Sequence, residues 1–330
     1  MNIMGQKTII GITQGDTNGI GYEVIVKALS DARILEMCTP VVYGSSRFFG
    51  MFRKEIPETD QIATNVILTV ADARPKRVNI INAVPDNLAV EIGQPALDGA
   101  KAAKASLEAA TADLLAGKID AMVTAPFNKH TMHDAGFGFS GHTEYLINAT
   151  GVGDGLMFLC SSHLKVGVAT NHLPISKVAP SINKDLIVGK LRLMNASLVK
   201  DFGLVRPKIA VLGLNPHAGD GGFLGSEEID VIAPAVAAAT SEGILAFGPY
   251  PADGFFGSDM VNGFDAVLAM YHDQGMIPFK SSSFDDGVNF TAGLPVVRTS
   301  PDHGTAFAIA GKNQADPGSM LSAIFCAIDI

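Results

Sequence analysis

Three histidines occupy the same kind of position in this sequence. His172, His217 and His272 each follow a short apolar run and precede Pro or Gly within a few residues. Neutral imidazoles are good ligands for zinc and similar divalent metals, and three of them leave an open position for a substrate. A single histidine is more often a helix cap, a core hydrogen-bonding group or a surface residue. Three equivalent positions among the eight histidines of the chain favour a metal site.

A second group of residues has the chemistry of an anion site. Gly141-His-Thr-Glu144 places an imidazole beside a hydroxyl where a helix is expected to begin, and exposed N–H groups at a helix N-terminus attract anions. Thr143 would alternatively cap that helix. Lys280, Asn289 and Arg298 could join the pair around a phosphate through charge-assisted hydrogen bonds. Surface exposure of Lys280 and Arg298 is the alternative.

The secondary-structure elements that must position these residues are expected to alternate between strands and helices, as in βαβ units. Short β-branched runs alternate with longer Ala/Leu-rich stretches, which predicts an α/β fold. The predicted strands are Thr8–Thr13, Pro40–Gly44, Val78–Asn82, Ala121–Thr124, Lys165–Ala169, Lys208–Gly213 and Ala266–Met270. The predicted helices are Tyr22–Ser30, Gln94–Ala116, Ser181–Asp201 and Glu227–Glu242.

Most of the chemically unusual residues come directly after a predicted strand. They are Gly15-Asp16, Pro126 with Lys129, His172, Asn215-Pro-His217 and His272. In open α/β sheets, ligands bind beyond the carboxyl ends of the strands. The distribution therefore predicts a cleft lined by these residues.

Bulk composition narrows the class of protein. The length of 330 residues suggests about two domains of roughly 150 residues. With 47% hydrophobic and 17% charged residues the chain is rich in core-forming residues, and a net charge of −9 argues against a nucleic-acid partner. The three scattered cysteines predict neither a disulfide framework nor a cysteine zinc site. No signal peptide or membrane-spanning run is evident, so we expect a cytoplasmic protein without a membrane partner.

No Gly-x-Gly-x-x-Gly dinucleotide fingerprint is present. Gly15–Gly21 and Gly219–Gly225 are glycine-rich but have other spacings, and a tight connection is the default interpretation of each. His303-Gly-Thr-Ala306 forms a polar loop near the C-terminus. The residues alone lead to an α/β enzyme whose reaction is unassigned.

Six segments together resemble the 4-hydroxythreonine-4-phosphate dehydrogenase family of vitamin B6 synthesis, and the resemblance runs from Ile9 to about Leu321. They are Gly141-His-Thr-Glu, Asn171-His-Leu-Pro, Leu212-Gly-Leu-Asn-Pro-His-Ala-Gly, Ala269-Met-Tyr-His-Asp-Gln-Gly, Ile277-Pro-Phe-Lys and Arg298-Thr-Ser-Pro-Asp-His-Gly-Thr-Ala. The resemblance implies two α/β/α domains, similar to isocitrate and isopropylmalate dehydrogenases, with a cleft between them. The expected first domain is 1–136 plus 290–330, and the second is 137–289.

The resemblance also implies an activity. It is NAD-dependent and divalent-metal-dependent oxidation of 4-phosphooxy-L-threonine at C3, followed by decarboxylation to 3-amino-2-oxopropyl phosphate. Related dehydrogenases act on phosphorylated threonate or erythronate and on aromatic dihydrodiols, and Lys280, Asn289 and Arg298 favour a phosphorylated substrate. A non-redox metal-dependent phosphatase or aldolase and a metabolite-binding regulator remain alternatives.

Residue roles carry over from the resemblance position by position. The implied metal ligands are His172, His217 and His272, with zinc or cobalt favoured over magnesium or manganese, in a site completed across a homodimer interface. The implied substrate contacts are His142, Thr143, Lys280, Asn289 and Arg298. The implied cofactor-binding residues are Asp16, Gly19, Gly21, His303, Gly304, Thr305, Ala306 and Gly311.

Two points stay open at this stage. Asp253 and Asp273 are both candidates for the general base, and either could instead orient a histidine. Thr17, Asn18 and Tyr22 depart from the family's usual Pro, Ala and Pro in the expected cofactor turn.

Overall fold

The structure is a computed structural model that describes residues 7–85, 87–283 and 285–330. It divides into two compact α/β units. Unit 1 comprises the chain up to Gly151 together with Leu294–Ile330, and unit 2 comprises Val152–Gly293. The α/β class predicted from the sequence is therefore confirmed.

The two units divide later along the chain than the sequence suggested. The sequence predicted domain boundaries at 136/137 and 289/290. It therefore assigned 137–151 to the second domain and 290–293 to the first. In the structure 137–151 belongs to unit 1. The physical reason is an aromatic cluster in which the Phe137 ring lies 5.6 Å from Phe127 and 5.4 Å from Tyr145, which joins this segment to the rest of unit 1.

Unit 1 is built on a parallel sheet whose strands lie in the order β3-β4-β2-β1-β5-β12. Its strands are β1 (Thr8–Thr13), β2 (Cys38–Gly44), β3 (Thr64–Ile67), β4 (Val78–Asn82), β5 (Ala121–Thr124) and β12 (Val297–Pro301). Every residue of β2 is buried, as expected for a parallel strand covered on both faces.

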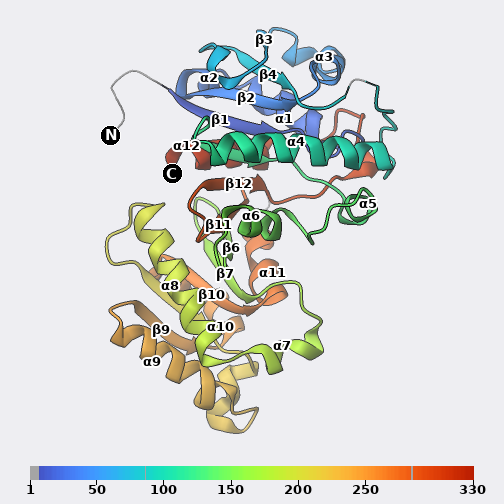
Figure 1. The fold of residues 1–330 in the computed structure, drawn as a ribbon. Helices are drawn as coiled ribbons and strands as arrows, with labels where there is room; N and C mark the ends of the chain where they lie inside the picture. The colour runs from blue at the N-terminus through green and yellow to red at the C-terminus, as the bar shows by residue number, and fades with distance from the viewer. Residues whose placement is uncertain (1–6, 86, 284) are drawn as a thin grey trace. The chain divides into compact units, whose positions relative to one another are not determined.

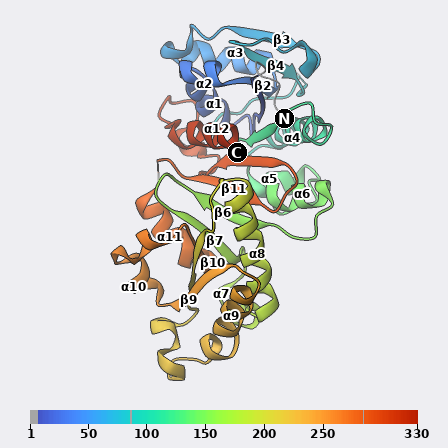
Figure 2. The same ribbon diagram turned by 90° about the vertical axis from the view of Figure 1, so that its left-hand side faces the viewer.

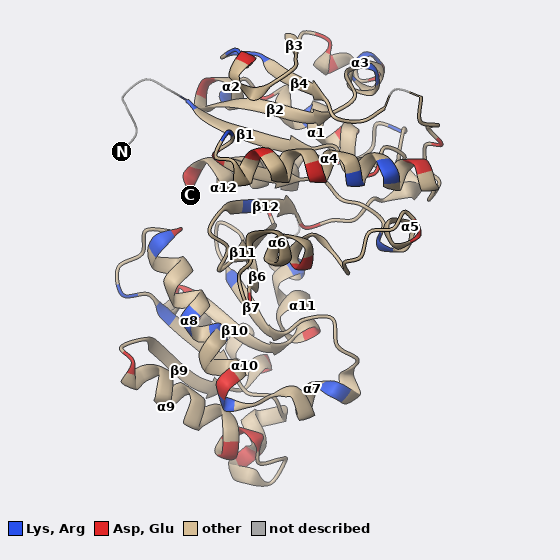
Figure 3. Cartoon of the chain, viewed as in Figure 1, with Lys and Arg blue, Asp and Glu red and all other residues tan. Residues whose placement is uncertain are grey.

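Helices cover both faces of this sheet. They are α1 (Gly21–Leu29), α2 (Ala32–Met37), α3 (Ser46–Glu55), α4 (Leu97–Leu115), α5 (Lys129–Asp134), α6 (His142–Thr150) and α12 (Gly318–Asp329), with 3₁₀ turns η1 (Pro57–Thr59), η2 (Val70–Asp72) and η6 (Phe307–Ile309). Helix α4 lies on one face, and α1 and α12 lie on the other (Figures 1 and 2). Small residues of α4, such as Ala100, Ala103 and Ala110, are buried, and acidic and basic residues occur at intervals along the helix (Figure 3).

Unit 2 contains a mixed sheet in the order β11-β6-β7-β10-β8-β9. Strand β6 is antiparallel to both neighbours, and β7, β10, β8 and β9 are parallel. The strands are β6 (Leu156–Cys160), β7 (Lys165–Thr170), β8 (Lys208–Leu212), β9 (Leu245–Tyr250), β10 (Ala266–Tyr271) and β11 (Val288–Ala292).

The helices of unit 2 again flank the sheet, with α8 against β6, β7 and β11 and α11 against β7 and β10. They are α7 (Ile175–Ser181), α8 (Lys184–Lys200), α9 (Ala233–Ser241), α10 (Ala252–Phe256) and α11 (His272–Ser282). The short turns are η3 (Pro216–Gly222), a π turn η4 (Glu228–Ile232) and η5 (Asp259–Gly263). None of the helices in the described ranges combines the length and apolar character needed to span a membrane.

Three predicted helices are longer than the helices of the structure. The predicted Gln94–Ala116 helix corresponds to α4, which spans Leu97–Leu115. The predicted Ser181–Asp201 helix begins at Lys184, because the Asn183 side chain caps the helix by accepting a hydrogen bond from the Leu186 N–H. The predicted Glu227–Glu242 helix starts as the π turn before α9. Helix α11 was not predicted, because its Gly275 and Pro278 are residues that usually interrupt helices.

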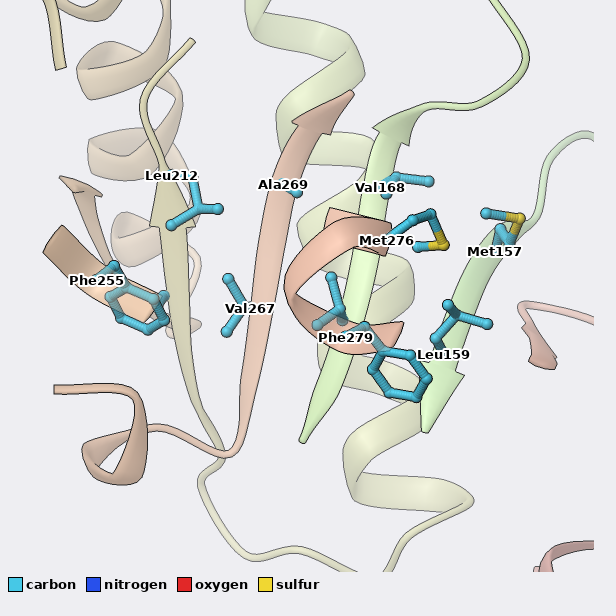
Figure 4. Close-up of a cluster of buried hydrophobic side chains, with 11 residues drawn as sticks. Met157, Leu159, Val168, Leu212, Phe255, Val267, Ala269, Met276 and Phe279 are labelled. Carbon is cyan, nitrogen blue, oxygen red and sulfur yellow. The ribbon is translucent and has the colours of Figure 1, made fainter. Parts of the chain in front are cut away.

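Helix α11 docks tightly on the core of unit 2. Met276 and Phe279 lie against Val168 and Leu159 of the sheet in a cluster of buried apolar side chains (Figure 4). Gly275 permits this close approach, because a Cβ atom there would lie 2.8 Å from Cγ1 of Val166. The helix that begins at His272 is therefore held at a fixed distance from β7 and β10.

Substituting Gly275 tests this packing. Gly275→Ala should lower the free energy of unfolding by about 1 to 3 kcal/mol, because the added methyl group overpacks against buried branched side chains. Gly189→Ala in α8 is the matched control, because nothing lies within 4 Å of its Cβ position. It should raise stability by roughly 0.5 to 1 kcal/mol. Urea unfolding measures both, and equal effects of the two changes would contradict the close approach.

Candidate active site

His172 and His272 lie side by side at one edge of the unit 2 sheet. Strands β7 and β10 are parallel neighbours with Thr170 paired to Tyr271, so the two histidines follow strand ends that are in register. Their ring centroids are 5.6 Å apart. His272 Nδ1 forms a 2.7 Å hydrogen bond with the Asp273 carboxylate, which leaves Nε2 for another partner. A carboxylate that orients an imidazole in this way is typical of metal-ligating histidines.

Gln274 ties the ends of two of these strands together. Its side-chain oxygen accepts a 2.7 Å hydrogen bond from the Met270 N–H, and its amide group donates a 2.6 Å bond to the Gly213 carbonyl. The Thr170 hydroxyl donates to the Met270 carbonyl at 2.8 Å. The carboxyl ends of β7, β10 and β8 are therefore fixed relative to one another.

His217 stands on a left-handed turn beyond β8. The backbone φ angles from His217 to Gly221 are all positive, at 53°, 50°, 80°, 45° and 63°. Non-glycine residues adopt this conformation at a cost of about 1 to 2 kcal/mol each, so the three here, His217, Ala218 and Asp220, need external support. The histidine side chain is exposed.

Glu228 supplies that support. Its buried carboxylate accepts 2.7 Å hydrogen bonds from the N–H groups of Leu214 and Asn215 and a 3.0 Å bond from the Asn215 side chain. Burial would raise the pKa of Glu228, but these bonds outweigh it and hold the pKa below its usual range. A Cβ atom at Gly219 would lie 2.6 Å from this carboxylate, so the turn and Glu228 are fitted to each other. No motif in the sequence indicated a role for Glu228.

The three predicted ligands are only partly brought together within one chain. His172 and His272 are neighbours, but among the described residues no group of three His, Cys, Asp or Glu side chains is placed to hold a metal ion. Two neighbouring imidazoles, one of them oriented by Asp273, are ligands of the type that zinc accepts, but they are fewer than the three protein ligands of a typical catalytic zinc site. His217 is not placed with this pair in the described part of the chain.

Unit 1 assembles three of the predicted substrate residues. Arg298 on β12 is buried, and its guanidinium donates two hydrogen bonds, of 3.0 and 2.7 Å, to the Thr124 hydroxyl. Burial lowers the pKa of Arg298 to about 10, against the effect of the Glu144 carboxylate, so it is charged at neutral pH. His142 and Thr143 open helix α6, and Thr143 does not cap it.

His142 is held as a neutral imidazole. Its ring stacks on Phe127 with centroids 4.0 Å apart. Burial and then the positive charges of Arg298 and Lys129 hold its pKa well below the ordinary value. A neutral ring between two cations can donate a hydrogen bond to an anion without carrying charge itself.

The remaining substrate residues lie in unit 2. Asn289 is on β11, paired with Leu159, and its side-chain oxygen is buried without a hydrogen-bond partner among the described residues. Lys280 is exposed in the last turn of α11. An orphaned buried amide oxygen is costly unless a ligand satisfies it.

The two predicted cofactor segments meet in unit 1. The Ile20 N–H donates to the Thr305 carbonyl at 3.0 Å, and a Cβ atom at Gly19 would lie 2.7 Å from that same oxygen. The other predicted cofactor-binding residues lie close to this contact in the sequence. Gly21 is the first residue of α1, and His303 and Gly304 precede Thr305. Ala306 follows Thr305 and has a positive φ of 43°. Gly311 follows with a φ of 71°.

Asp16 is fully buried in this turn. Oδ1 accepts a 3.0 Å hydrogen bond from the Asn18 N–H, whereas Oδ2 has no partner among the described residues. Burial raises the pKa of Asp16 to about 6, partly offset by the Asn18 bond. The Asn18 side-chain oxygen accepts from the Glu91 N–H at 2.7 Å, which attaches a further loop to the turn.

Two of the three departures from the family pattern, Thr17 and Tyr22, share one hydrogen-bonded network. The Gln14 amide donates to the Thr17 hydroxyl at 2.6 Å, and the Tyr22 hydroxyl donates to the Gln14 side-chain oxygen. Tyr22 also accepts a 2.8 Å bond from the Ser45 N–H. Thr17 and Tyr22 are thus linked through Gln14, and no single-position pattern in the sequence signals this.

The two candidate bases have different surroundings. Asp273 is engaged with His272, as described above. Asp253 is exposed in the first turn of α10, a helix that packs against η3, which carries His217. These placements favour an orienting role for Asp273 and leave Asp253 as the available carboxylate.

Comparison with known proteins shows to which family the chain belongs. Residues 36–327 match the family described as "Pyridoxal phosphate biosynthetic protein PdxA". A protein of Bacteroides thetaiotaomicron named 4-hydroxythreonine-4-phosphate dehydrogenase is 48% identical over 325 residues, which cover 98% of this chain and 89% of that protein. The chain belongs to the PdxA family.

Solved structures agree with membership of the PdxA family. A 4-hydroxythreonine-4-phosphate dehydrogenase from Klebsiella pneumoniae has a TM-score of 0.87 at 37% identity, covering 99% of both chains. A terephthalate 1,2-cis-dihydrodiol dehydrogenase from Burkholderia xenovorans has a TM-score of 0.66 at 25% identity, covering 98% of both chains. The fold of the PdxA family therefore also occurs with a different named substrate.

The Glu228 support can be tested by an isosteric change. Glu228→Gln should lower the free energy of unfolding by about 1 to 3 kcal/mol at neutral pH, because an amide N–H would face donors. Glu227→Gln, which loses one bond to Asn215, is the control and should cost less. Because the folded pKa of Glu228 is depressed, its contribution exists above the unfolded pKa and is lost as pH falls. Urea unfolding should show that the difference in free energy of unfolding between wild type and Glu228→Gln becomes smaller at acidic pH. A difference that does not change with pH would contradict the stabilising role of the Glu228 carboxylate.

Asp16 predicts the opposite dependence on pH. Its folded pKa is about 6 against an ordinary 3.8, so ionisation of the buried carboxyl destabilises the fold as pH rises through 6. Asp16→Asn should therefore be more stable than wild type at pH ~8 by on the order of 1 to 3 kcal/mol, with no difference below pH ~4. Asp60→Asn, at an exposed position, is the control. Thermal melting across this pH range would refute the claim if Asp16→Asn were less stable in alkali.

Proposed function

We propose that this protein is an NAD-dependent and divalent-metal-dependent 4-hydroxythreonine-4-phosphate dehydrogenase of vitamin B6 biosynthesis. It would oxidise 4-phosphooxy-L-threonine at C3 and release 3-amino-2-oxopropyl phosphate and CO₂. The observation that carries the proposal is the 48% identity over 98% of the chain to a relative of that name. The pairing of His172 with His272 and the buried Arg298 support the chemistry.

The substrate's phosphate would bind in unit 1. Arg298 presents a positive charge held in place by Thr124, and the N-terminus of α6 presents free N–H groups beside His142 and Thr143. Because His142 is neutral, it can donate one hydrogen bond while the cation carries the charge. Lys280 and Asn289 of unit 2 are further proposed substrate contacts, and the orphaned Asn289 oxygen suits a donor on the substrate, such as its amino group.

A metal would be held by His172 and His272, with His217 as the third proposed ligand. When bound, the cation stabilises negative charge on a substrate oxygen, and nicotinamide supplies the hydride acceptor. Asp273 keeps the His272 ring oriented so that Nε2 is available. Three imidazoles favour zinc or cobalt. NAD would lie along the Asp16–Gly21 turn and the His303–Ala306 loop, with Gly311 beyond them.

The substrate's own structure explains the second step. Oxidation at C3 places a ketone β to the carboxylate, and such acids lose CO₂ readily because the electron pair left at C2 is delocalised onto the ketone oxygen. The hydroxyl proton is released in the first step, and one proton is taken up at C2 in the second. Asp253 is the carboxylate we propose for these proton transfers, since Asp273 is engaged with His272.

A homodimer is part of the proposal. Large apolar side chains are exposed near the proposed ligands in unit 2: Phe223 (84%), Ile175 (73%) and Ile229 (53%). Exposed apolar groups of this size mark interaction surfaces. A second copy covering them would bring its own histidines to the site and could complete the ligand set. We also propose a cytoplasmic location, which the three free cysteines support.

The activity is tested by a substrate comparison. Wild type with NAD should produce NADH and CO₂ from 4-phosphooxy-L-threonine, and a chelator should abolish both. The dephosphorylated analogue should have a kcat/KM at least about 100-fold lower, because Arg298 would lose its anion. Arg298→Ala should remove most of that difference.

Other outcomes select other functions. Faster turnover of phosphorylated threonate would favour the related dehydrogenase, and a dihydrodiol substrate would place the chain with the Burkholderia xenovorans enzyme. Phosphate release without NADH would indicate a phosphatase, and full activity in chelator would remove the metal.

A further inference from the structure

Lys129 lies against the start of helix α6 although no motif assigned it a role. It is the first residue of α5, directly after Asn128, whose side chain accepts 3.0 Å hydrogen bonds from the His130 and Thr131 N–H groups and so fixes where the helix begins. Two residues earlier, Phe127 stacks on His142. Lys129 Cε is 3.8 Å from the Cβ position of Gly141, the residue that caps α6.

No carboxylate oxygen of the described residues forms an ion pair with the Lys129 ammonium. Seven other lysines of the described ranges have a carboxylate oxygen within 4.0 Å: Lys7, Lys27, Lys76, Lys101, Lys118, Lys190 and Lys200. Lys129 is exposed and forms no ion pair or hydrogen bond among the described residues. Its charge is therefore available to a ligand.

Lys129 and Arg298 act on the same imidazole from two different elements. Both cations depress the pKa of His142, which places both within electrostatic range of that ring. Arg298 comes from β12 and is buried, whereas Lys129 comes from α5 and is exposed. Two cations around a neutral donor at a helix N-terminus suit a doubly charged anion better than a singly charged one.

We propose that Lys129 is a further phosphate-binding residue, which with Arg298 and the N-terminus of α6 forms a two-cation site selective for a phosphate monoester dianion. This inference rests on the proposed function for the identity of the substrate. It assigns Lys129 to specificity: the buried Arg298 supplies a fixed charge, and the exposed Lys129 reaches the ligand from the solvent side. The Glu144 carboxylate lies at the same corner, with Oε2 3.1 Å from the Cβ position of Gly141, so the two cations also offset one negative charge there.

The test separates phosphate binding from turnover. Inorganic phosphate is titrated into the full-length protein by calorimetry, and KM and kcat are measured with 4-phosphooxy-L-threonine. Lys129→Ala should weaken phosphate binding and raise KM by about 10- to 100-fold, with kcat changed only a few-fold, because a charge-assisted contact to the bound anion is lost. Lys129→Arg should restore most of the affinity. Lys54→Ala, at another exposed lysine of unit 1, should behave as wild type.

The outcomes are distinguishable. Phosphate affinity and KM unchanged in Lys129→Ala would overturn the inference whatever the reaction proves to be. Loss of phosphate affinity in a protein whose wild type does not oxidise 4-phosphooxy-L-threonine would support the two-cation site and sink the proposed substrate. Lys129→Met keeps the apolar stem of the side chain, so its melting temperature should equal that of wild type. It should nevertheless bind phosphate as weakly as Lys129→Ala. Phosphate affinity equal to wild type in Lys129→Met would contradict a role for the charge.

Discussion

The alignment of strand ends in unit 2 is the constraint on which the proposed chemistry depends. Parallel strands present their carboxyl ends at one edge, and here Gln274 locks the end of β10 to the end of β8 while Thr170 holds β7 to β10. His172 and His272 are neighbours because they follow that edge directly. Close packing of α11 through Gly275 then fixes the height of His272 above the sheet. The proposed metal site would inherit its geometry from this backbone arrangement.

Charge is distributed differently in the two units, and each distribution has an energetic consequence. Unit 1 buries Arg298 and keeps His142 neutral beside it, so an incoming anion meets positive charge without a competing imidazolium. It also buries Asp16, whose ionisation destabilises the fold at neutral pH. Unit 2 instead uses a carboxylate, Glu228, to hold a strained left-handed turn. Proteins commonly retain such strained or destabilising features where function requires them.

Much of this could be predicted from the sequence, and the limits have physical causes. The α/β fold and the strands β1, β4 and β5 followed from apolar runs, because periodicity reports burial directly. The grouping of His172 with His272 followed from their shared position after strands. Helix α11 was missed because packing, which sequence does not display, offsets its Gly275 and Pro278. Glu228 was missed because its role comes from hydrogen bonds to Leu214 and Asn215 that only the folded chain creates. The role that we propose for Lys129 likewise depends on its position near Gly141, which the sequence does not display.

The central claim is that His172 and His272 act as one unit on one ion, and a double-mutant cycle on zinc affinity tests it most directly. Zinc binding to the full-length protein would be measured by equilibrium dialysis for wild type, His172→Ala, His272→Ala and the double variant. Each single change should weaken binding by at least about tenfold, and the double variant should lose far less than the product of the two losses, because either change already dismantles the shared site. Wild-type affinity in both single variants, or losses that multiply independently, would contradict the account.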